Sequence, residues 1–163
     1  MNISAASHAA EQAGPATRAG LRVLVADDDR ASREVYADAL IGHGYDVDAA
    51  EDGAAAWQAL NAHSYDLLIT NDQMPRMTGV ELLKRLRARR MEMPVIMASV
   101  SLPEREFRRY PWLQPAATLL KPFTPVELLV KVREVLRATG NSQAEAMRSP
   151  PWRSRPPAGV LPP

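Results

Sequence analysis

The sequence predicts an α/β fold, a doubly wound parallel sheet of five strands built from five βα units. Short apolar runs alternate along the chain with segments whose apolar residues recur at helical spacing. The connections between them are short, which favours parallel strands joined by helices that cover both faces of the sheet. Polar residues directly follow several apolar runs, as is typical of the carboxyl edge of such a sheet.

Five apolar runs are predicted to be strands. The run at 66–70 contains Leu67, Leu68 and Ile69 in succession, which is typical of a central parallel strand buried on both faces. The predicted strands are 21–26, 46–50, 66–70, 95–98 and 118–120.

Apolar spacing predicts the first two helices, and prolines limit the fourth. The residues expected to face inward are Ala31, Val35, Ala39 and Leu40 in the first helix, and Ala56, Trp57 and Leu60 in the second. Because Pro103 and Pro111 bound the fourth helix, it is predicted to be short and irregular.

Capping residues mark the two remaining helices. Thr78 with Glu81, and Thr124 with Glu127, form capping boxes that open a helix. Gly140 is predicted to end the last helix. The predicted helices are therefore 30–42, 53–62, 78–88, 104–110 and 124–138.

One domain is predicted over residues 21–140, with a tail on each side. Residues 1–20 are rich in Ala and Ser, and residues 141–163 are rich in Pro. Neither segment carries enough large apolar residues to offset the entropy of ordering it. Both are predicted to be disordered.

Composition argues against several classes of function. Residues 21–140 contain 16 Lys and Arg against 17 Asp and Glu, which argues against a dedicated nucleic-acid binder. The chain has no cysteine, which excludes disulfides and favours a reducing compartment. It has neither a signal-peptide pattern nor an apolar run near the roughly 20 residues that span a bilayer. A cytoplasmic protein without direct contacts to nucleic acid or membrane is expected.

The strand ends place polar residues together at the carboxyl edge of the predicted sheet. These residues are Asp27, Asp28, Asn71, Ser99 and Lys121. Two adjacent carboxylates, Asp27 and Asp28, suit Mg²⁺, which prefers oxygen ligands. A carboxylate at position 71 would complete the cluster and could attack phosphorus, with a hydroxyl and an ammonium beside the phosphoryl oxygens.

The order and spacing of these motifs resemble the receiver domain of two-component response regulators. The matching segments are Val23–Asp29, Asp66–Gly79 and Lys121–Phe123. The resemblance covers residues 21–138 and implies a flavodoxin-like (βα)5 fold, a signalling role rather than an enzymatic one, and Mg²⁺ as cofactor. The partners it implies are a sensor histidine kinase or phosphotransfer protein and a protein target of unknown identity. The chain is expected to be a monomer or a weak homodimer.

The resemblance also assigns a metal site. By analogy, Asp28 ligates the cation directly, Asp27 does so through water, and the backbone carbonyl of Gln73 is the third ligand. The family's phosphorylated aspartate lies three residues before the Met of the Met-Pro pair, and here that position holds Asn71. An amide is a poor nucleophile and a weaker Mg²⁺ ligand, so weakened metal binding is expected. The neighbouring Asp72 should face away from Asp28, because successive strand side chains point to opposite faces.

Three further positions correspond to the family's switch residues, and two of them hold the residue type that the family has. Ser99 matches the Ser or Thr at the end of the fourth strand, and Lys121 matches the family's lysine, with a cis bond expected before Pro122. Thr118 stands where the family usually has an aromatic residue, so the usual aromatic-rotamer coupling is not expected.

Three functions are compatible with these residues. The first is a stand-alone receiver module in a phosphorelay, acting through protein–protein contacts and atypical because of Asn71. The alternative is a conventional phosphorylation-dependent regulator with Asp72 as acceptor. The remote alternative is a Mg²⁺-dependent phosphatase-like enzyme that uses Asp27 and Asp29 as an Asp-x-Asp pair. Ala31 stands where such phosphatases usually have Thr or Val, which argues against this enzyme.

Overall fold

The computed structural model describes residues 20–148, and a five-stranded parallel sheet lies at its centre. The strands are β1 (Arg22–Ala26), β2 (Asp46–Ala50), β3 (Leu67–Thr70), β4 (Val95–Ser99) and β5 (Ala117–Leu120). Their order across the sheet is β2-β1-β3-β4-β5, and every neighbouring pair is parallel. Thr70 of β3 lies in register with Ala26 of β1 and Met97 of β4. The carboxyl ends of these central strands therefore lie at one edge.

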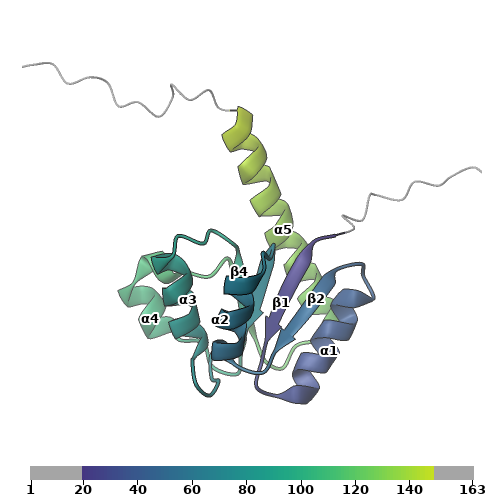
Figure 1. Ribbon diagram of the computed structural model, residues 1–163, viewed down its shortest axis with the longest axis vertical. Helices are drawn as coiled ribbons and strands as arrows, with labels where there is room; N and C mark the ends of the chain where they lie inside the picture. Colours follow the sequence, from purple (N-terminus) through teal and green to yellow (C-terminus); the bar gives the residue numbers. More distant parts are fainter. Residues whose placement is uncertain (1–19, 149–163) are drawn as a thin grey trace, which may run out of the picture.

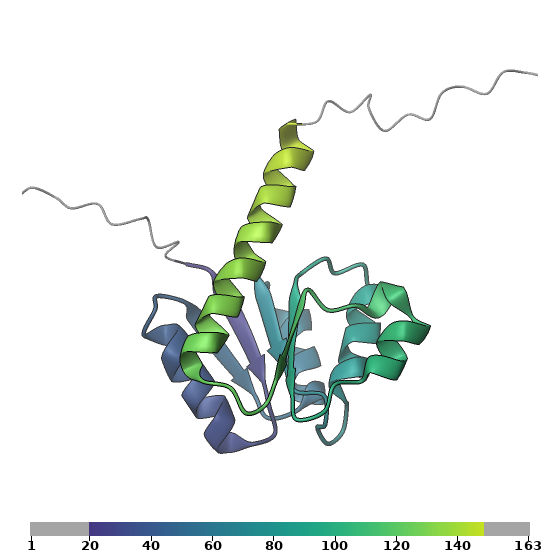
Figure 2. The ribbon, with the colours of Figure 1, turned by 180° about the vertical axis from the view of Figure 1, so that it is seen from behind.

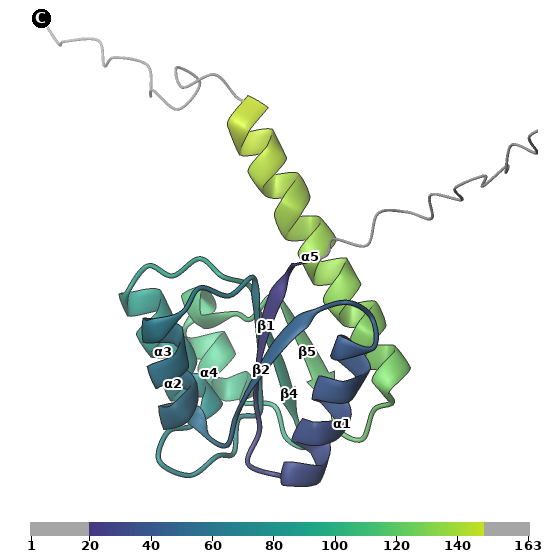
Figure 3. The same cartoon turned by 45° about the vertical axis from the view of Figure 1, so that its right-hand side comes forward.

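Helices cover both faces of the sheet, which confirms the predicted doubly wound fold. The helices are α1 (Arg30–Ile41), α2 (Gly53–Ala62), α3 (Gly79–Ala88), α4 (Glu104–Arg109), the 3-10 turn η1 (Pro111–Leu113) and α5 (Pro125–Arg148). α1 and α5 lie on one face, and α2, α3 and α4 lie on the other (Figures 1 and 3). Seen from behind, α5 runs alongside α1 and continues beyond the sheet (Figure 2).

The strands divide the core into two layers. In β1, Leu24 and Ala26 pack toward α2, α3 and α4, whereas Val23 and Val25 pack toward α1 and α5. This alternation is the two-residue period of an extended strand. Because both layers are apolar, polar side chains that follow the strands are held at the sheet edge.

Three expected inward positions differ from the sequence prediction. In α1 the buried residues are Tyr36 and Leu40, whereas Ala31 is exposed and Val35 is 48% exposed. The Tyr36 ring stacks on Phe123 with 5.0 Å between ring centroids, which turns Val35 toward solvent. In α2, Trp57 is only partly buried and lies at the border with α3, whereas Ala56 and Leu60 are buried as predicted.

The prediction that the last helix ends at Gly140 is wrong, because α5 continues to Arg148. A glycine inside a helix costs only about 1 kcal/mol relative to alanine. The residues that follow include the helix formers Gln143, Ala144 and Glu145. Part of the predicted C-terminal tail is therefore helical, and the rest of both predicted tails lies outside the described residues.

No helix within residues 20–148 combines the length and the apolar character needed to cross a membrane.

Candidate functional site

Five side chains from four segments gather at the carboxyl edge of the sheet, and we call them the carboxyl-edge site. They are Asp27 and Asp28 after β1, Asn71 after β3, Ser99 at the end of β4 and Lys121 after β5. Asp27, Asn71 and Ser99 are buried. The backbone of Asn71 continues the sheet, because its N–H donates to the carbonyl of Ala26 at 2.9 Å.

The side-chain amide of Asn71 joins two oxygen acceptors. Its nitrogen donates to Oδ1 of Asp28 at 2.9 Å and to the backbone carbonyl of Gln73 at 3.0 Å. A carboxylate and a carbonyl oxygen only accept hydrogen bonds, so the nitrogen rather than the oxygen of the amide must face them. Asn71 therefore donates hydrogen bonds at a position where a carboxylate would add a further negative charge.

Lys121 forms an ion pair with Asp27. Its Nζ lies 2.5 Å from Oδ2 of Asp27, and the two side chains are 12% and 3% exposed. The other oxygen of Asp27 accepts from the backbone N–H of Asp29 at 3.0 Å. The ammonium also lies 5.8 Å from the centroid of the Tyr36 ring. The Lys121–Pro122 peptide bond is cis.

Asp72 points toward α3. Its Oδ1 accepts from the backbone N–H of Val80 at 3.0 Å, and its carbonyl accepts from Gly79 at 2.9 Å. Burial raises the pKa of the Asp72 carboxyl. A Cβ on Gly79 would overlap the carbonyl oxygen of Asn71, so this glycine allows the loop to fold back on itself. The carboxylate of Asp72 is thus used at the start of α3, while Asn71 contacts Asp28.

The remaining candidate residues have separate surroundings. Ser99 is fully buried, and its hydroxyl oxygen lies 3.5 Å from the backbone nitrogen of Ser101. Thr118 is exposed on β5. Asp29 is exposed and caps α1, accepting from the backbone N–H of Ser32 at 2.9 Å. Hydrogen bonding to the side chain of Ser32, and then to its backbone N–H, lowers the pKa of the Asp29 carboxyl.

Sequence reasoning missed an ion-pair clamp on the loop between β3 and α3. Arg76 adopts a left-handed backbone conformation with φ of 65° and pairs with Glu51 and with the fully buried Asp52. Gly53 lies so close to Met77 that a Cβ would overlap the Met77 carbonyl. These contacts hold the loop that carries the Gln73 carbonyl against the start of α2. The partners are more than 20 residues apart, and no local pattern marks the pairing.

Mg²⁺ binds carboxylate and carbonyl oxygens such as those of this site, but the Asn71 amide already donates hydrogen bonds to two of them. Oδ1 of Asp28 and the Gln73 carbonyl converge on the amide nitrogen. In the part of the chain that the structure describes, no three His, Asp or Glu side chains are placed to hold a metal ion. Asp27, Asp28 and the Gln73 carbonyl would have to hold Mg²⁺ in competition with this amide.

Comparison with known proteins identifies the family. Residues 23–133 match the response regulator receiver domain family. The chain belongs to this family. It is 35% identical over 131 residues to the response regulator MprA of Mycobacterium ulcerans, covering 79% of this chain and 56% of that protein. It is 29% identical over 124 residues to protein RcaC of Microchaete diplosiphon, covering 75% of this chain and 19% of that protein. The chain thus spans only about half of MprA and a fifth of RcaC.

Solved receiver structures share the fold. A Francisella response regulator receiver domain, numbered 1452, matches 73% of this chain and 98% of its own, with a TM-score of 0.67 and 30% identity. The response regulator TrrA from Thermotoga maritima, solved in complex with Mg²⁺ and BeF, matches 71% of this chain and 98% of its own, with a TM-score of 0.62 and 28% identity. These matches confirm the predicted receiver fold and a place in two-component signalling. Receiver domains are signalling modules rather than typical enzymes.

Proposed function

We propose that this chain is an atypical receiver module that acts through protein–protein contacts and does not depend on phosphorylation. The observation that carries the proposal is the pair of hydrogen bonds from the Asn71 amide to Asp28 and to the Gln73 carbonyl. The amide supplies no nucleophilic oxygen anion, and it links the two oxygens that a cation would otherwise link.

The geometry of Asp72 disfavours the alternative acceptor. Its carboxylate accepts from Val80 at the start of α3, and Gly79 fixes the loop between them. Turning Asp72 toward Asp28 would break this contact and displace the Asn71 amide. Asp29 is likewise used as the cap of α1, which disfavours an Asp-x-Asp phosphatase.

Magnesium binding is proposed to be weak. Asp27 and Asp28 keep their charges available to a cation, but Lys121 pairs with Asp27 and Asn71 donates to Asp28. A bound Mg²⁺ would compete with the Lys121 ammonium for Asp27 and with the Asn71 hydrogen bond for Asp28.

Exposed apolar side chains support a function through protein contacts. Trp112 of η1, Leu120 of β5, and Val126 and Val130 of α5 are all exposed. By resemblance to the family, a sensor histidine kinase or phosphotransfer protein and a separate protein target are the proposed partners. The same resemblance proposes the surface of α4, β5 and α5 as one contact region.

Intact-mass spectrometry after incubation with acetyl phosphate and Mg²⁺ tests the proposal. The native chain should gain no phosphate-sized mass, whereas Asn71→Asp should gain one, because this variant restores a carboxylate beside Asp28, Ser99 and Lys121. A gain on the native chain that is lost in Asp72→Ala would overturn the proposal and identify Asp72 as acceptor. No gain in Asn71→Asp would contradict the assignment of position 71 to the site.

A further inference from the structure

Basic residues collect at the end of α3 beside an α2 that carries no charge. Residues 53–62 contain no Asp, Glu, Lys or Arg, whereas residues 79–90 contain five Lys and Arg and a single acid, Glu81. α1 differs, because residues 30–41 contain two arginines and two acids. Residues 79–90 therefore carry a net charge of +4, against +1 for residues 104–109 and +1 for residues 125–148.

Three arginines of this segment have no acidic partner. Arg85, Arg89 and Arg90 are exposed, and none forms an ion pair with any residue in the described range 20–148. Lys84 pairs with Glu106 at 3.1 Å, and Glu81 accepts from the backbone of Thr78 in the capping box. The exposed Glu92 follows Arg90 by two residues and forms no ion pair within residues 20–148. The guanidinium groups are left to solvent or to a partner.

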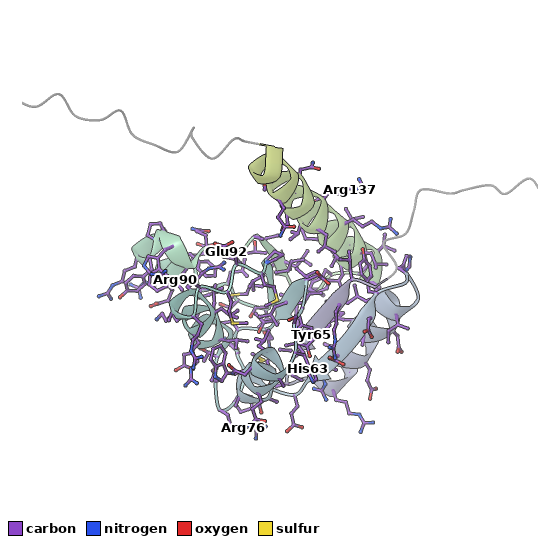
Figure 4. The ribbon with its side chains drawn as sticks, turned by 45° about the horizontal axis from the view of Figure 1, so that its top comes forward. His63, Tyr65, Arg76, Arg90, Glu92 and Arg137 are labelled. Atoms are coloured by element: carbon purple, nitrogen blue, oxygen red, sulfur yellow. The ribbon has the colours of Figure 1, made fainter. Side chains whose placement is uncertain are left out.

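Trp57 of α2 fixes the position of two of these arginines. The guanidinium carbons of Arg85 and Arg89 each lie 5.8 Å from the centroid of the partly buried Trp57 ring. Arg90 follows in a left-handed conformation with φ of 55°, which ends the helix. Figure 4 shows Arg90 on the side of the molecule opposite Arg137 of α5. We call Trp57, Arg85, Arg89 and Arg90 the α2–α3 basic surface.

The chemistry of this surface fits carboxylates presented by a helix. A guanidinium binds a carboxylate through two parallel hydrogen bonds, and stacking on an aromatic ring lowers the side-chain entropy lost on binding. Arg85 and Arg89 are four residues apart on one helix face, a spacing of about 6 Å. Acidic residues four apart on a partner helix have the same spacing.

Other occupants fit less well. A duplex nucleic acid needs a longer track of positive charge, but α2 is neutral and the exposed acid Glu92 follows Arg90. The chain's own terminal segments supply no acidic pair, because residues 1–19 contain a single acid, Glu11, and residues 149–163 contain none.

We propose that the α2–α3 basic surface docks an acidic helix of a partner protein. This inference rests on the proposed function, which requires protein contacts, but it concerns a different face from α4, β5 and α5. Binding of an acidic helix to this surface requires neither a conformational change at Asn71 nor phosphorylation of the chain.

A peptide titration of the full chain tests the proposal. The probe is an alanine-based helical peptide of about 20 residues with Glu pairs four residues apart, and a Gln-for-Glu peptide is its control. The Glu peptide should shift the NMR signal of the Trp57 indole N–H, and added salt should weaken its binding. Arg85→Glu with Arg89→Glu should weaken binding at least about tenfold. The matched reversal Arg105→Glu with Arg109→Glu on α4 should leave binding unchanged.

Three results would overturn the docking surface. They are equal binding of the Gln peptide, loss of binding only in the α4 variant, and tighter binding of duplex DNA at the same residues. Thermal unfolding by circular dichroism establishes that both variants are folded. Failure of the peptide to bind leaves the phosphodonor result unaffected, so the two proposals fail separately.

Discussion

The side-chain nitrogen of Asn71 lies 2.9 Å from Oδ1 of Asp28, so a hydrogen bond stands where an aspartate at position 71 would create a pair of like charges. The same nitrogen reaches the Gln73 carbonyl at 3.0 Å. With Lys121 paired to Asp27, both acids of the site have a donor within the chain itself. Each acid of the pair Asp27 and Asp28 therefore has a hydrogen-bond donor within the chain, although only Asp27 is paired with a positive charge.

Magnesium affinity should rise when this amide becomes a carboxylate. We expect Asn71→Asp to bind Mg²⁺ at least about tenfold more tightly than the native chain, because a charged ligand replaces a competing hydrogen-bond donor. Isothermal titration calorimetry measures both affinities. Adding Asp28→Asn to the Asn71→Asp variant should remove most of the gain. Equal affinities in the native chain and Asn71→Asp would mean that residue 71 does not face the metal.

In the absence of metal, Asn71→Asp should be less stable than the native chain, although it should bind Mg²⁺ more tightly. Asn71→Asp loses two hydrogen bonds and places a third negative charge near Asp27 and Asp28, so we expect the free energy of unfolding to fall by about 1–3 kcal/mol. Urea unfolding in the presence of a chelator measures this change, and Mg²⁺ should reverse it.

The control for that measurement is Asn141→Asp, the same chemical change at an exposed position of α5. Its effect on the free energy of unfolding should stay within about 0.5 kcal/mol, because a surface substitution leaves no buried charge unpaired. If both variants lost the same stability, the effect at position 71 would not come from the carboxyl-edge site.

Local sequence patterns predicted most of the fold because each rests on neighbouring residues. The apolar run of β3 predicted a central strand, and the capping box at Thr78 and Glu81 is present at the start of α3. Alternation along a strand also predicted that Asp72 would face away from Asp28, and its carboxylate contacts Val80 instead.

The features that sequence analysis missed depend on distant contacts. The burial of Tyr36 in place of Val35 follows from stacking on Phe123, which lies far along the chain. The pairing of Arg76 with Asp52 joins two loops, and the direction of the Asn71 amide depends on Asp28 from another strand end. The helical course of α5 past Gly140 shows that a single glycine is a weak stop signal when helix-forming residues follow.

The clamp between Arg76 and Asp52 should contribute measurably to stability. The Oδ2 atom of Asp52 is buried, and among residues 20–148 the Arg76 guanidinium is its one charged partner. Arg76→Ala should therefore lower the free energy of unfolding by about 1–3 kcal/mol. Urea denaturation measures the change.

Two variants separate the ion pair from backbone strain at this position. Arg76→Gly removes the charge but adopts a positive φ readily, so it should lose less stability than Arg76→Ala. Arg30→Ala breaks the exposed pair with Glu34 and should cost less than about 0.5 kcal/mol. If Arg76→Ala were as stable as the native chain, the ion pair would contribute nothing.

The position of Asp72 should give its carboxyl a distinct effect on stability as pH changes. Burial raises its pKa above the usual 3.8, so the folded chain holds this proton more tightly than the unfolded chain does. The contribution of Asp72 to stability is therefore fully present below the unfolded pKa and is lost as pH rises through the folded pKa.

Asp72→Asn keeps an acceptor for the Val80 N–H but cannot ionise. Relative to the native chain, it should gain stability between pH 3 and pH 7, as measured by urea unfolding across that range. Asp72→Ala removes the acceptor and should lose about 1 kcal/mol at pH 7. Parallel pH profiles for the native chain and Asp72→Asn would show that this carboxyl is not perturbed in the folded protein.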